Sequence, residues 1–417
     1  MYIVGIDIGK RNHEASIMNA AGKQYGKPIR FANSHTGFNK LMDWVKNISG
    51  ADDVVFGMEA TGHYWLALYT HLCHEGYAVH VINAVQSDAL RGMYIRQAKN
   101  DSRDSFIIAE VIRFGRFCET AVSAPELHAL RELCRHRFWI VDSVSDLKRK
   151  VIALLDQVFP EYENLFTNTF GKTSLQLLSE YTTPEELLAV DTDKLAETIY
   201  TASRGHHGIE KAQEIQNTAR NSFGILLASD SIALLIRQYI EQIRFVEKQV
   251  DRIDTEIARL LSAFDNQLTT ITGIGPTLAA TILSEIGDIR KFASPGKLAA
   301  FAGIDPTMKQ SGNFVGSHVH MSKRGSSLAR RVLHMVALNN VKVDKGSGTP
   351  VNPVVYDYYT RKCSGKKKTV AMGAVMHKIC NIIFAMLRDN KPFEVITPEE
   401  HCRRFAAEHP DKIRKAA

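Results

Sequence analysis

Residues 2–32, YIVGIDIGKRNHEASIMNAAGKQYGKPIRFA, contain three strand-like apolar runs, at 2–9, 13–20 and 24–32. Only a few residues separate one run from the next. Connections this short join antiparallel strands, because a parallel pair needs a crossover of about a dozen residues or more. The stretch therefore predicts three antiparallel strands, and the first of them ends on a carboxylate, Asp7.

Alternating helix and strand patterns follow this stretch. Apolar residues at helical spacing predict helices over 36–47 and 64–76, and short apolar runs predict strands over 53–59 and 77–83. Three antiparallel strands followed by helix, strand, helix and strand is the order of a ribonuclease-H-type fold. The actin-like and sugar-kinase fold has the same order, so both folds remain candidates at this point.

The kinase alternative depends on phosphate-binding loops. GIDIGK, residues 5–10, resembles the first phosphate loop of sugar kinases, and that fold also needs a second acid–glycine loop and a glycine-rich adenosine motif. AGIDPT, residues 302–307, imitates the second loop, but Pro306 stands where a glycine is needed for close approach of the backbone. We therefore predict the ribonuclease-H type.

The composition of the 417 residues is that of a globular protein, with 45% hydrophobic and 23% charged residues. A net charge of +7 is compatible with a nucleic-acid partner without requiring one. Six scattered cysteines without a C-x-x-C pair indicate reduced thiols and a cytoplasmic protein. No uninterrupted apolar run of about 20 residues is present, so we expect no membrane span.

Beyond residue 100 the patterns are mostly helical, so the predicted fold class is α/β plus all-α. Apolar residues from 236 to 260 alternate spacings of three and four with charges between them, which predicts a coiled-coil helix that dimerises. An amphipathic helix packed on its own chain remains the alternative. The expected parts are a catalytic domain at 1–158, a helical segment without a packing assignment at 159–227, the coiled-coil helix at 228–263, a compact domain at 264–345 and a basic helical tail at 346–417.

Four carboxylates in the first domain stand where a metal site would need them. Asp7 ends the first predicted strand and Glu59 ends the fourth, and these two strands are neighbours in a ribonuclease-H-type sheet. Asp101 and Asp104 are three residues apart at the opening of a predicted helix, which places both on one face. A helix packed against this edge of the sheet would bring all four acids together. Each acid alone also has a plain structural explanation, such as a helix cap for Asp101.

Converging carboxylates repel one another unless cations lie between them. Mg²⁺ prefers oxygen ligands and keeps some of its water, which leaves room for a phosphate. Two such ions roughly 4 Å apart stabilise the attacking and leaving oxygens of a phosphodiester. We therefore predict a two-metal Mg²⁺ site, in which Mn²⁺ can substitute.

GIGPTLAATIL, residues 273–283, resembles the hairpin of a helix–hairpin–helix motif. Gly273 and Gly275 would form a tight turn whose backbone N–H groups face a phosphate, ahead of a helix N-terminus that favours anions. Several basic residues further along would neutralise phosphates without regard to base sequence. They are Lys309, Lys323, Arg324, Arg330 and Arg331.

Ser311 lies between Gln310 and Gly312 in this basic region. A serine beside a glycine is a turn residue or a nucleophile, and a nucleophilic hydroxyl needs a base or a metal to activate it. His318 and His320 are the nearest candidates for a base. The residues alone leave both possibilities open.

Six motifs in order give the whole chain a resemblance to the DEDD insertion-sequence transposases, a family that includes bridge-RNA-guided recombinases and related DNA invertases. They are GIDIGK (5–10), GMEATGHY (57–64), KNDSRDS (99–105), GIGPTLAATIL (273–283), FAGIDPTMKQSG (301–312) and SKRGSSLARRVL (322–333). The resemblance implies a RuvC-like N-terminal domain and a C-terminal transposase domain.

The resemblance also implies roles for particular residues. The family's four acids correspond to Asp7, Glu59, Asp101 and Asp104. Its essential serine, which attacks DNA and forms a covalent link, corresponds to Ser311, with Ser322 as a less favoured candidate.

The family further implies donor and target DNA, a non-coding guide RNA, a homodimer or homotetramer, and a place at the bacterial nucleoid. A DNA invertase using the same residues is one alternative function. A RuvC-like nuclease without serine chemistry is the other.

Overall fold

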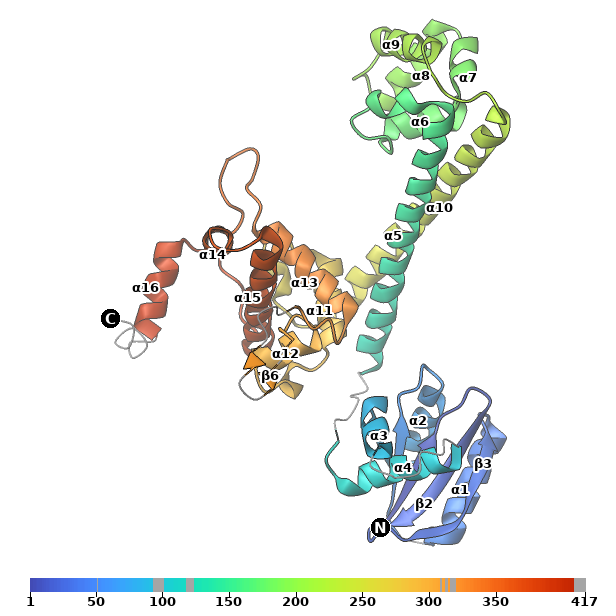
Figure 1. Cartoon of the computed structure of the whole chain (residues 1–417), viewed down its shortest axis with the longest axis vertical. Helices are drawn as coiled ribbons and strands as arrows, with labels where there is room; N and C mark the ends of the chain where they lie inside the picture. The colour runs from blue at the N-terminus through green and yellow to red at the C-terminus, as the bar shows by residue number, and fades with distance from the viewer. Residues whose placement is uncertain are drawn as a thin grey trace. The chain divides into compact units, whose positions relative to one another are not determined.

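A computed structural model describes residues 1–50, 52–92, 101–117, 124–307, 310–311, 314–315 and 320–408. The side chains of residues 101–102, 310–311, 314–315 and 408 lie outside this description. The chain divides into two compact units, Met1–Val122 and Ser123–Ala417, each of which is described by itself below (Figure 1).

Unit 1 contains a five-stranded mixed sheet in the order β3-β2-β1-β4-β5. The two hairpin pairs β1–β2 and β2–β3 are antiparallel, and the pairs β1–β4 and β4–β5 are parallel. The predicted strands of this domain are therefore confirmed. They are β1 (Tyr2–Asp7), β2 (Asn12–Asn19), β3 (Gln24–Ala32), β4 (Val54–Glu59) and β5 (Ala78–Ile82).

Helices cover both faces of this sheet. The predicted helices α1 (His35–Ser49) and α2 (Trp65–His74) share one apolar cluster with the strands, and α4 (Asp101–Phe114) shares the cluster on the other face. Helix α4 lies so close to β1 that a Cβ atom at Gly5 would stand 2.1 Å from the carbonyl oxygen of Ser105. A glycine is therefore required where this helix crosses the strand. The mixed sheet between helices agrees with the predicted ribonuclease-H type.

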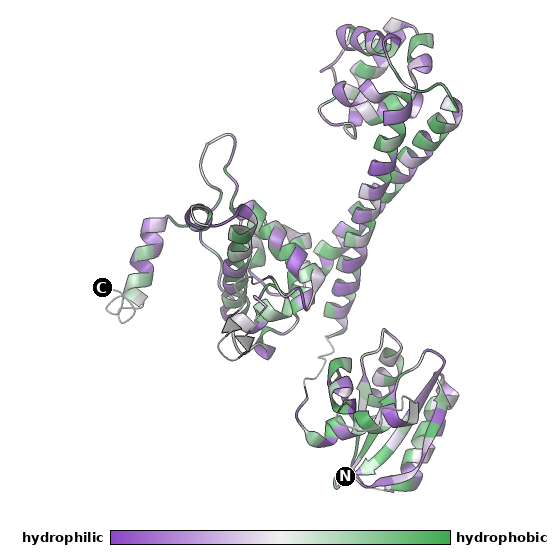
Figure 2. Ribbon diagram, in the orientation of Figure 1, coloured by the Kyte–Doolittle hydropathy of each residue, from purple (hydrophilic) through white to green (hydrophobic). Residues whose placement is uncertain are grey.

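Unit 2 is built on two long helices, α5 (Pro125–Val158) and α10 (Ser229–Leu261), which pack along each other as an antiparallel hairpin (Figure 1). Apolar and polar residues alternate along both helices (Figure 2). The hairpin carries a small helical cluster at one end. Its elements are η1 (Pro160–Asn164), α6 (Lys172–Glu180), α7 (Pro184–Ala189), α8 (Thr192–Ser203) and α9 (Ile209–Arg220).

The heptad seam of α10 is covered by the same chain. Ile236, Ile240 and Ile243 are fully buried in a cluster shared with α5 and the α6–α9 helices, and Ile257 is fully buried in a second cluster with the start of α5. The seam is thus one half of an intramolecular helix pair. Because its buried positions already have partners, the predicted pairing of this seam with a second chain finds no support in these residues, and the alternative of packing within the chain accounts for them.

The distal part of unit 2 is a helical domain around α15 (Lys368–Asp389), whose residues from Ala371 to Met386 belong largely to the core. Among the helices in the described part of the chain, α15 alone is long and apolar enough to cross a membrane, and half of its apolar window is buried inside the protein. The other elements here are η2 (Leu268–Thr270), α11 (Pro276–Ile286), η3 (Ile289–Lys291), α12 (Pro295–Phe301), β6 (Gln310–Ser311), β7 (Phe314–Val315), α13 (Ser327–Asn340), α14 (Pro353–Cys363) and α16 (Pro398–Glu408).

The division between the units falls earlier than the predicted end of the first domain at residue 158. Helix α5 packs on α10 and α11, so it belongs structurally with unit 2. The predicted helical segment at 159–227 corresponds to η1 and α6–α9, whose apolar faces close over the far end of the hairpin.

Candidate active site

The strand register brings two of the predicted acids to one edge of the sheet. Ile6 of β1 pairs with Met58 of β4 in a parallel ladder, so Asp7 and Glu59 follow side by side at the C-terminal ends of the two strands. Gly5 and Gly57 both face α4, since a Cβ atom on either would collide with that helix. Side chains alternate along a strand, so Asp7 and Glu59, two residues further on, face the same side.

Helix α4 places Asp104 on this same side of the sheet. Its residue Ser105 lies against Gly5, and the Ser105 hydroxyl is 2.7 Å from the hydroxyl of Ser16 on β2. Asp104 is buried one residue earlier, in the first turn of the helix. Asp101 begins α4, but its side chain lies outside the described residues.

Helix α3 (Ala84–Arg91), which the sequence did not predict, contacts both Glu59 and Asp104. The Ser87 hydroxyl donates to the Glu59 carboxylate, and Arg91 donates from Nε to Oδ1 of Asp104 at 3.1 Å. Ser87 and Arg91 are one helical turn apart, a rise of about 6 Å. The two carboxylates are therefore held near each other along one face of α3. The side chain of Asn83, which caps the Val85 amide at 3.0 Å, is the sequence signal for this helix.

A fifth carboxylate, also missed from the sequence, lies opposite Asp7. Glu14 of β2 pairs with Asp7 across the antiparallel ladder, and it lies two residues before Ser16, which faces α4. Alternation along β2 therefore puts Glu14 on the same face of the sheet. Four carboxylates, those of Asp7, Glu14, Glu59 and Asp104, therefore lie on this side of the sheet edge.

The donor chemistry of this edge fits a hard divalent cation, since its side chains offer carboxylate oxygens. Among the described side chains, no group of three acids, histidines or cysteines gathers tightly enough to hold a metal ion. Arg91 occupies one oxygen of Asp104, and Ser87 occupies one oxygen of Glu59. These bonds engage one oxygen of each carboxylate and do not by themselves keep the other oxygen from binding a metal.

The predicted nucleophile stands near the tip of a hairpin arm in unit 2. Ser311 of β6 pairs with Phe314 of β7, and the Thr307 amide donates to the His320 carbonyl at 2.8 Å at the base of this hairpin. The side chain of Ser311 is outside the description, as are the predicted residues Lys309 and His318.

Ser322, the less favoured serine, lies at the base of the same arm. Its hydroxyl donates to the Asp305 carboxylate, and its backbone amide donates to the Asp305 carbonyl at 2.8 Å. Both bonds close the base of the arm. This engagement gives Ser322 a structural role.

A groove of about 710 Å³ lies between α13, α14 and α15 of the same domain. Lys323, Arg330 and Arg331 line it, together with His334 and Lys368. Two of these cations are already engaged, because Arg330 donates to the Ala302 carbonyl at 3.0 Å and Arg331 forms two 2.7 Å bonds to Asp142. Arg324, in the turn before α13, is exposed but does not line the groove.

The two glycines of the predicted phosphate-binding turn differ in their surroundings. Gly273 has φ +85°, and its Cβ position lies 2.7 Å from Asn339 on α13, so it serves close packing. Gly275 directly precedes α11, and nothing lies within 4 Å of its Cβ position. The open helix N-terminus at Gly275 is thus the accessible half of this turn.

Two transposase family models match this chain, one in each half. Residues 4–160 match a transposase model of the DEDD IS110 type, and residues 265–352 match the transposase IS116/IS110/IS902 family. The chain belongs to this transposase family. The two matched regions contain the acidic edge and the serine arm respectively.

Relatives of this transposase align along nearly its whole length. The 44.8 kDa protein of insertion element IS116 from Streptomyces clavuligerus is 24% identical over 403 residues, which cover 95% of this chain and 96% of the relative. The 42 kDa protein of insertion element IS900 from Mycobacterium paratuberculosis is 23% identical over 401 residues, 94% and 97% of the two chains. A pilin gene-inverting protein from Moraxella bovis is 24% identical over 403 residues, 94% and 97%.

A buried carboxylate fixes the helix that follows the serine arm of the transposase. Glu285 of α11 accepts from Arg135 on α5 at 2.7 Å and from the Ser326 hydroxyl, which caps α13, at 2.7 Å. Burial alone would raise the pKa of Glu285, but the bonds from Arg135 and Ser326 lower it overall. The carboxylate therefore stays ionised and ties three helices together.

Glu285→Gln is expected to lower the unfolding free energy of the transposase by roughly 1–3 kcal/mol, because the charged partner of Arg135 is lost while Arg135 itself remains half exposed to water. The pKa of Glu285 is below its ordinary 4.5 in the folded state. Its contribution is therefore complete above pH 4.5 and is lost as the pH falls through the lower folded value. Denaturant unfolding at several pH values should show the gap between wild type and variant closing in acid. Glu256→Gln, in the exposed pair with Arg259, is the control and should leave the midpoint unchanged.

Proposed function

We propose that this transposase is a Mg²⁺-dependent DNA recombinase that cleaves and exchanges strands through a serine–DNA covalent intermediate. The proposal is supported by the placement of the predicted metal-binding carboxylates and the predicted nucleophilic serine in different units of the chain. Carboxylates from β1, β4 and α4 lie at one edge of unit 1, and a serine stands near the tip of an arm in unit 2. Together, the two parts would supply a nucleophile and a carboxylate metal site.

The covalent step is a transesterification. The Ser311 oxygen attacks the scissile phosphorus, a serine–phosphate bond forms, and the bond to the leaving DNA oxygen breaks. The proton lost by the serine hydroxyl is matched by the proton gained by the leaving oxygen. Because the phosphodiester energy is kept in the covalent link, strands can be exchanged and rejoined without an external energy source.

The acids would hold the metal in this scheme. Asp7, Glu59 and Asp104, with Asp101 as the fourth, would bind Mg²⁺, which as a Lewis acid stabilises charge on phosphate oxygens and lowers the pKa of a bound hydroxyl. The lysines and arginines around the arm and its groove would neutralise neighbouring phosphates. Lys323 and Lys368 suit this role best, since both line the groove and neither Arg330 nor Arg331 is free of protein contacts.

We further propose donor and target DNA as substrates, a non-coding RNA as guide, and a homodimer or homotetramer as the working assembly. The oligomer rests on the need for two cleaved DNA ends at once. It does not rest on the α10 seam, which is buried within the chain. The pilin gene-inverting relatives favour one alternative, inversion of a DNA segment by the same chemistry.

The test is direct. The full-length protein is incubated with DNA carrying the element ends, the RNA transcribed beside the gene, and Mg²⁺, and the mixture is then denatured. We expect a protein–DNA adduct that withstands denaturation and is absent when the metal is chelated. Metal-dependent cleavage without any adduct would instead identify a nuclease. Products with the intervening segment reversed, and none with it moved, would identify an invertase.

A further inference from the structure

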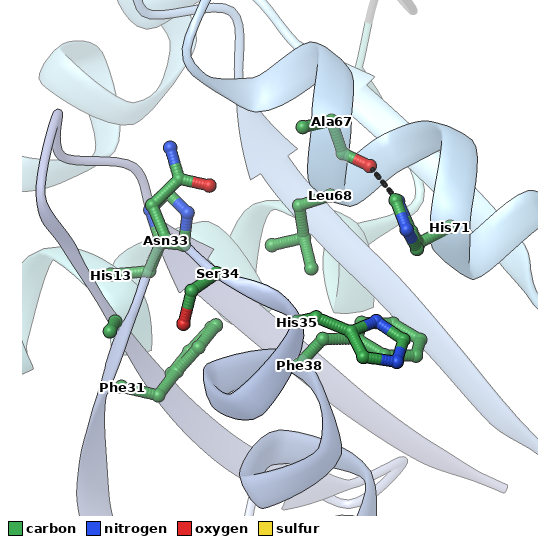
Figure 3. Close-up of a pocket in the computed structure, with 10 residues that line it drawn as sticks. His13, Phe31, Asn33, Ser34, His35, Phe38, Ala67, Leu68 and His71 are labelled. Carbon is green, nitrogen blue, oxygen red and sulfur yellow. Dashed lines mark hydrogen bonds between the residues drawn. The ribbon is translucent and has the colours of Figure 1, made fainter.

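A small pocket lies on the face of the unit 1 sheet opposite to the acidic edge. It has a volume of about 140 Å³ and lies between the end of β3, the start of α1 and helix α2 (Figure 3). Its walls include Phe31, Phe38 and Leu68, and its polar groups include His13, His35 and His71. The proposed recombinase chemistry uses none of these residues.

His13 is an incompletely bonded group inside the protein. It is only 2% exposed, and its Nδ1 accepts a hydrogen bond from the Gly9 amide at 3.3 Å. Burial lowers the pKa of His13 against an opposing contribution from the Asn33 side chain. In the neutral ring, the Gly9 bond accepted at Nδ1 leaves the single proton on Nε2. Among the described residues, this Nε2 is the one buried side-chain nitrogen or oxygen without a hydrogen-bond partner. Such donors in native proteins generally have a partner that the protein chain itself does not supply.

Aromatic rings form much of the pocket wall around His13. The rings of His13 and Phe31 have centroids 5.3 Å apart, and those of Phe38 and His71 are 5.5 Å apart. His71 Nδ1 lies 2.8 Å from the Ala67 carbonyl oxygen, a bond drawn in Figure 3. A carbonyl can only accept, so His71 donates from Nδ1, and its Nε2 is left as an acceptor when the ring is neutral. The pocket residues thus combine aromatic walls with one donor and one acceptor.

Two cations lie in a turn that is bonded to the pocket wall. Lys10 and Arg11 are exposed in the β1–β2 turn that leads into His13. The Asn33 amide, which lines the pocket, donates to the Lys10 carbonyl at 3.4 Å and so joins this turn to the wall. The two exposed cations of this turn would attract the phosphates of a bound strand.

We propose that this pocket binds one pyrimidine base turned out of a single-stranded nucleic acid. A cavity of about 150 Å³ accommodates benzene, so the volume here suits one six-membered ring and is small for a purine. A pyrimidine carbonyl would accept from His13 Nε2, and the base would stack on Phe38 or on His71, whose rings are tilted 54° to each other. The flanking phosphates would be attracted by Lys10 and Arg11. The inference rests on the proposed function, because it supposes that the protein works on nucleic acid with exposed bases.

The experiment uses the full-length protein and a short oligothymidylate with a central 5-bromodeoxyuridine, which forms photochemical cross-links to adjacent aromatic side chains. Mass spectrometry of the digested adduct is expected to place the cross-link on the segments that contain Phe38 or His71. Ala67→Trp fills the pocket from the exposed surface of α2 without removing a core residue. It should reduce this cross-link about tenfold, the size of one lost base stack.

Two comparisons sharpen the result. His13→Leu removes the buried donor and should weaken the cross-link several-fold, whereas His74→Ala, on the exposed side of the same helix, should leave it unchanged. An oligonucleotide with 8-bromodeoxyadenosine at the same position should cross-link poorly at this pocket. Thermal unfolding shows whether each variant is folded. Because Ala67→Trp and His13→Leu both test the pocket, either one suffices if the other does not fold.

Equal cross-linking in wild type and Ala67→Trp, or cross-links that map only outside the pocket, would overturn the proposal. If the 8-bromodeoxyadenosine oligonucleotide cross-links to the pocket as well as the 5-bromodeoxyuridine one does, the pocket does not select bases by ring size. Ser311→Ala should leave the pocket cross-link intact. Loss of the serine–DNA adduct and loss of base binding are therefore separate outcomes.

Discussion

Ser311→Ala is expected to eliminate the denaturation-resistant protein–DNA adduct and to reduce strand exchange by at least about 10³-fold, as removal of a covalent nucleophile does in other enzymes. The substitution deletes one oxygen from a residue of the short β6–β7 hairpin. Folding and DNA affinity should therefore match the wild type. Denaturing gel analysis of labelled DNA measures the adduct, and a gel shift on the same samples measures binding.

Ser322→Ala is the matched control, because it removes a serine hydroxyl from the base of the same arm. The Ser322 hydroxyl bonds to Asp305, so its loss should loosen the arm and lower the rate only modestly. The adduct should still form. If Ser322→Ala abolishes the adduct and Ser311→Ala does not, the nucleophile is Ser322. If both variants cleave normally, the covalent mechanism is wrong.

The sequence was most informative about unit 1, where local patterns specify the sheet. Strand lengths and short connections predicted β1 to β5 because side-chain alternation and turn length are local properties. The same patterns placed Asp7 and Glu59 at neighbouring strand ends, and the parallel register of β1 and β4 agrees with this. The family matches then supported both halves of the predicted architecture.

The sequence patterns did not show which elements pack against each other. The heptads of α10 are the same whether the facing helix comes from another chain or from α5, and only the fold shows that α5 covers them. The eight-residue helix α3 was too short for a clear period, so its contacts with Glu59 and Asp104 were not foreseen. Whether His13 Nε2 has a hydrogen-bond partner depends on how the elements around the pocket pack, and no local sequence pattern predicts this.

Asp7→Asn is expected to reduce metal-dependent strand cleavage on the order of 10³-fold while leaving nucleic-acid binding close to that of the wild type. The amide has nearly the same shape as the carboxylate, but it carries no charge and offers one oxygen instead of two. Asp7 is half-buried at the end of β1, between Glu59 on one neighbouring strand and Glu14 on the other. A carboxylate in that position should favour a bound cation, so its neutralisation should weaken the metal site without opening the core.

The control for Asp7 is Asp88→Asn on α3. Asp88 pairs with Arg91, whose guanidinium also bonds Asp104, but Asp88 itself is exposed and is not one of the predicted ligands. Its neutralisation should change cleavage by no more than about threefold, the scale of an exposed ion pair. Cleavage is measured across a Mg²⁺ titration, because a weakened metal site shifts the required metal concentration upward before it lowers the maximal rate. Full cleavage by Asp7→Asn at low Mg²⁺ would remove Asp7 from the metal site, and loss of the folded protein would show that its carboxylate serves the structure of the sheet.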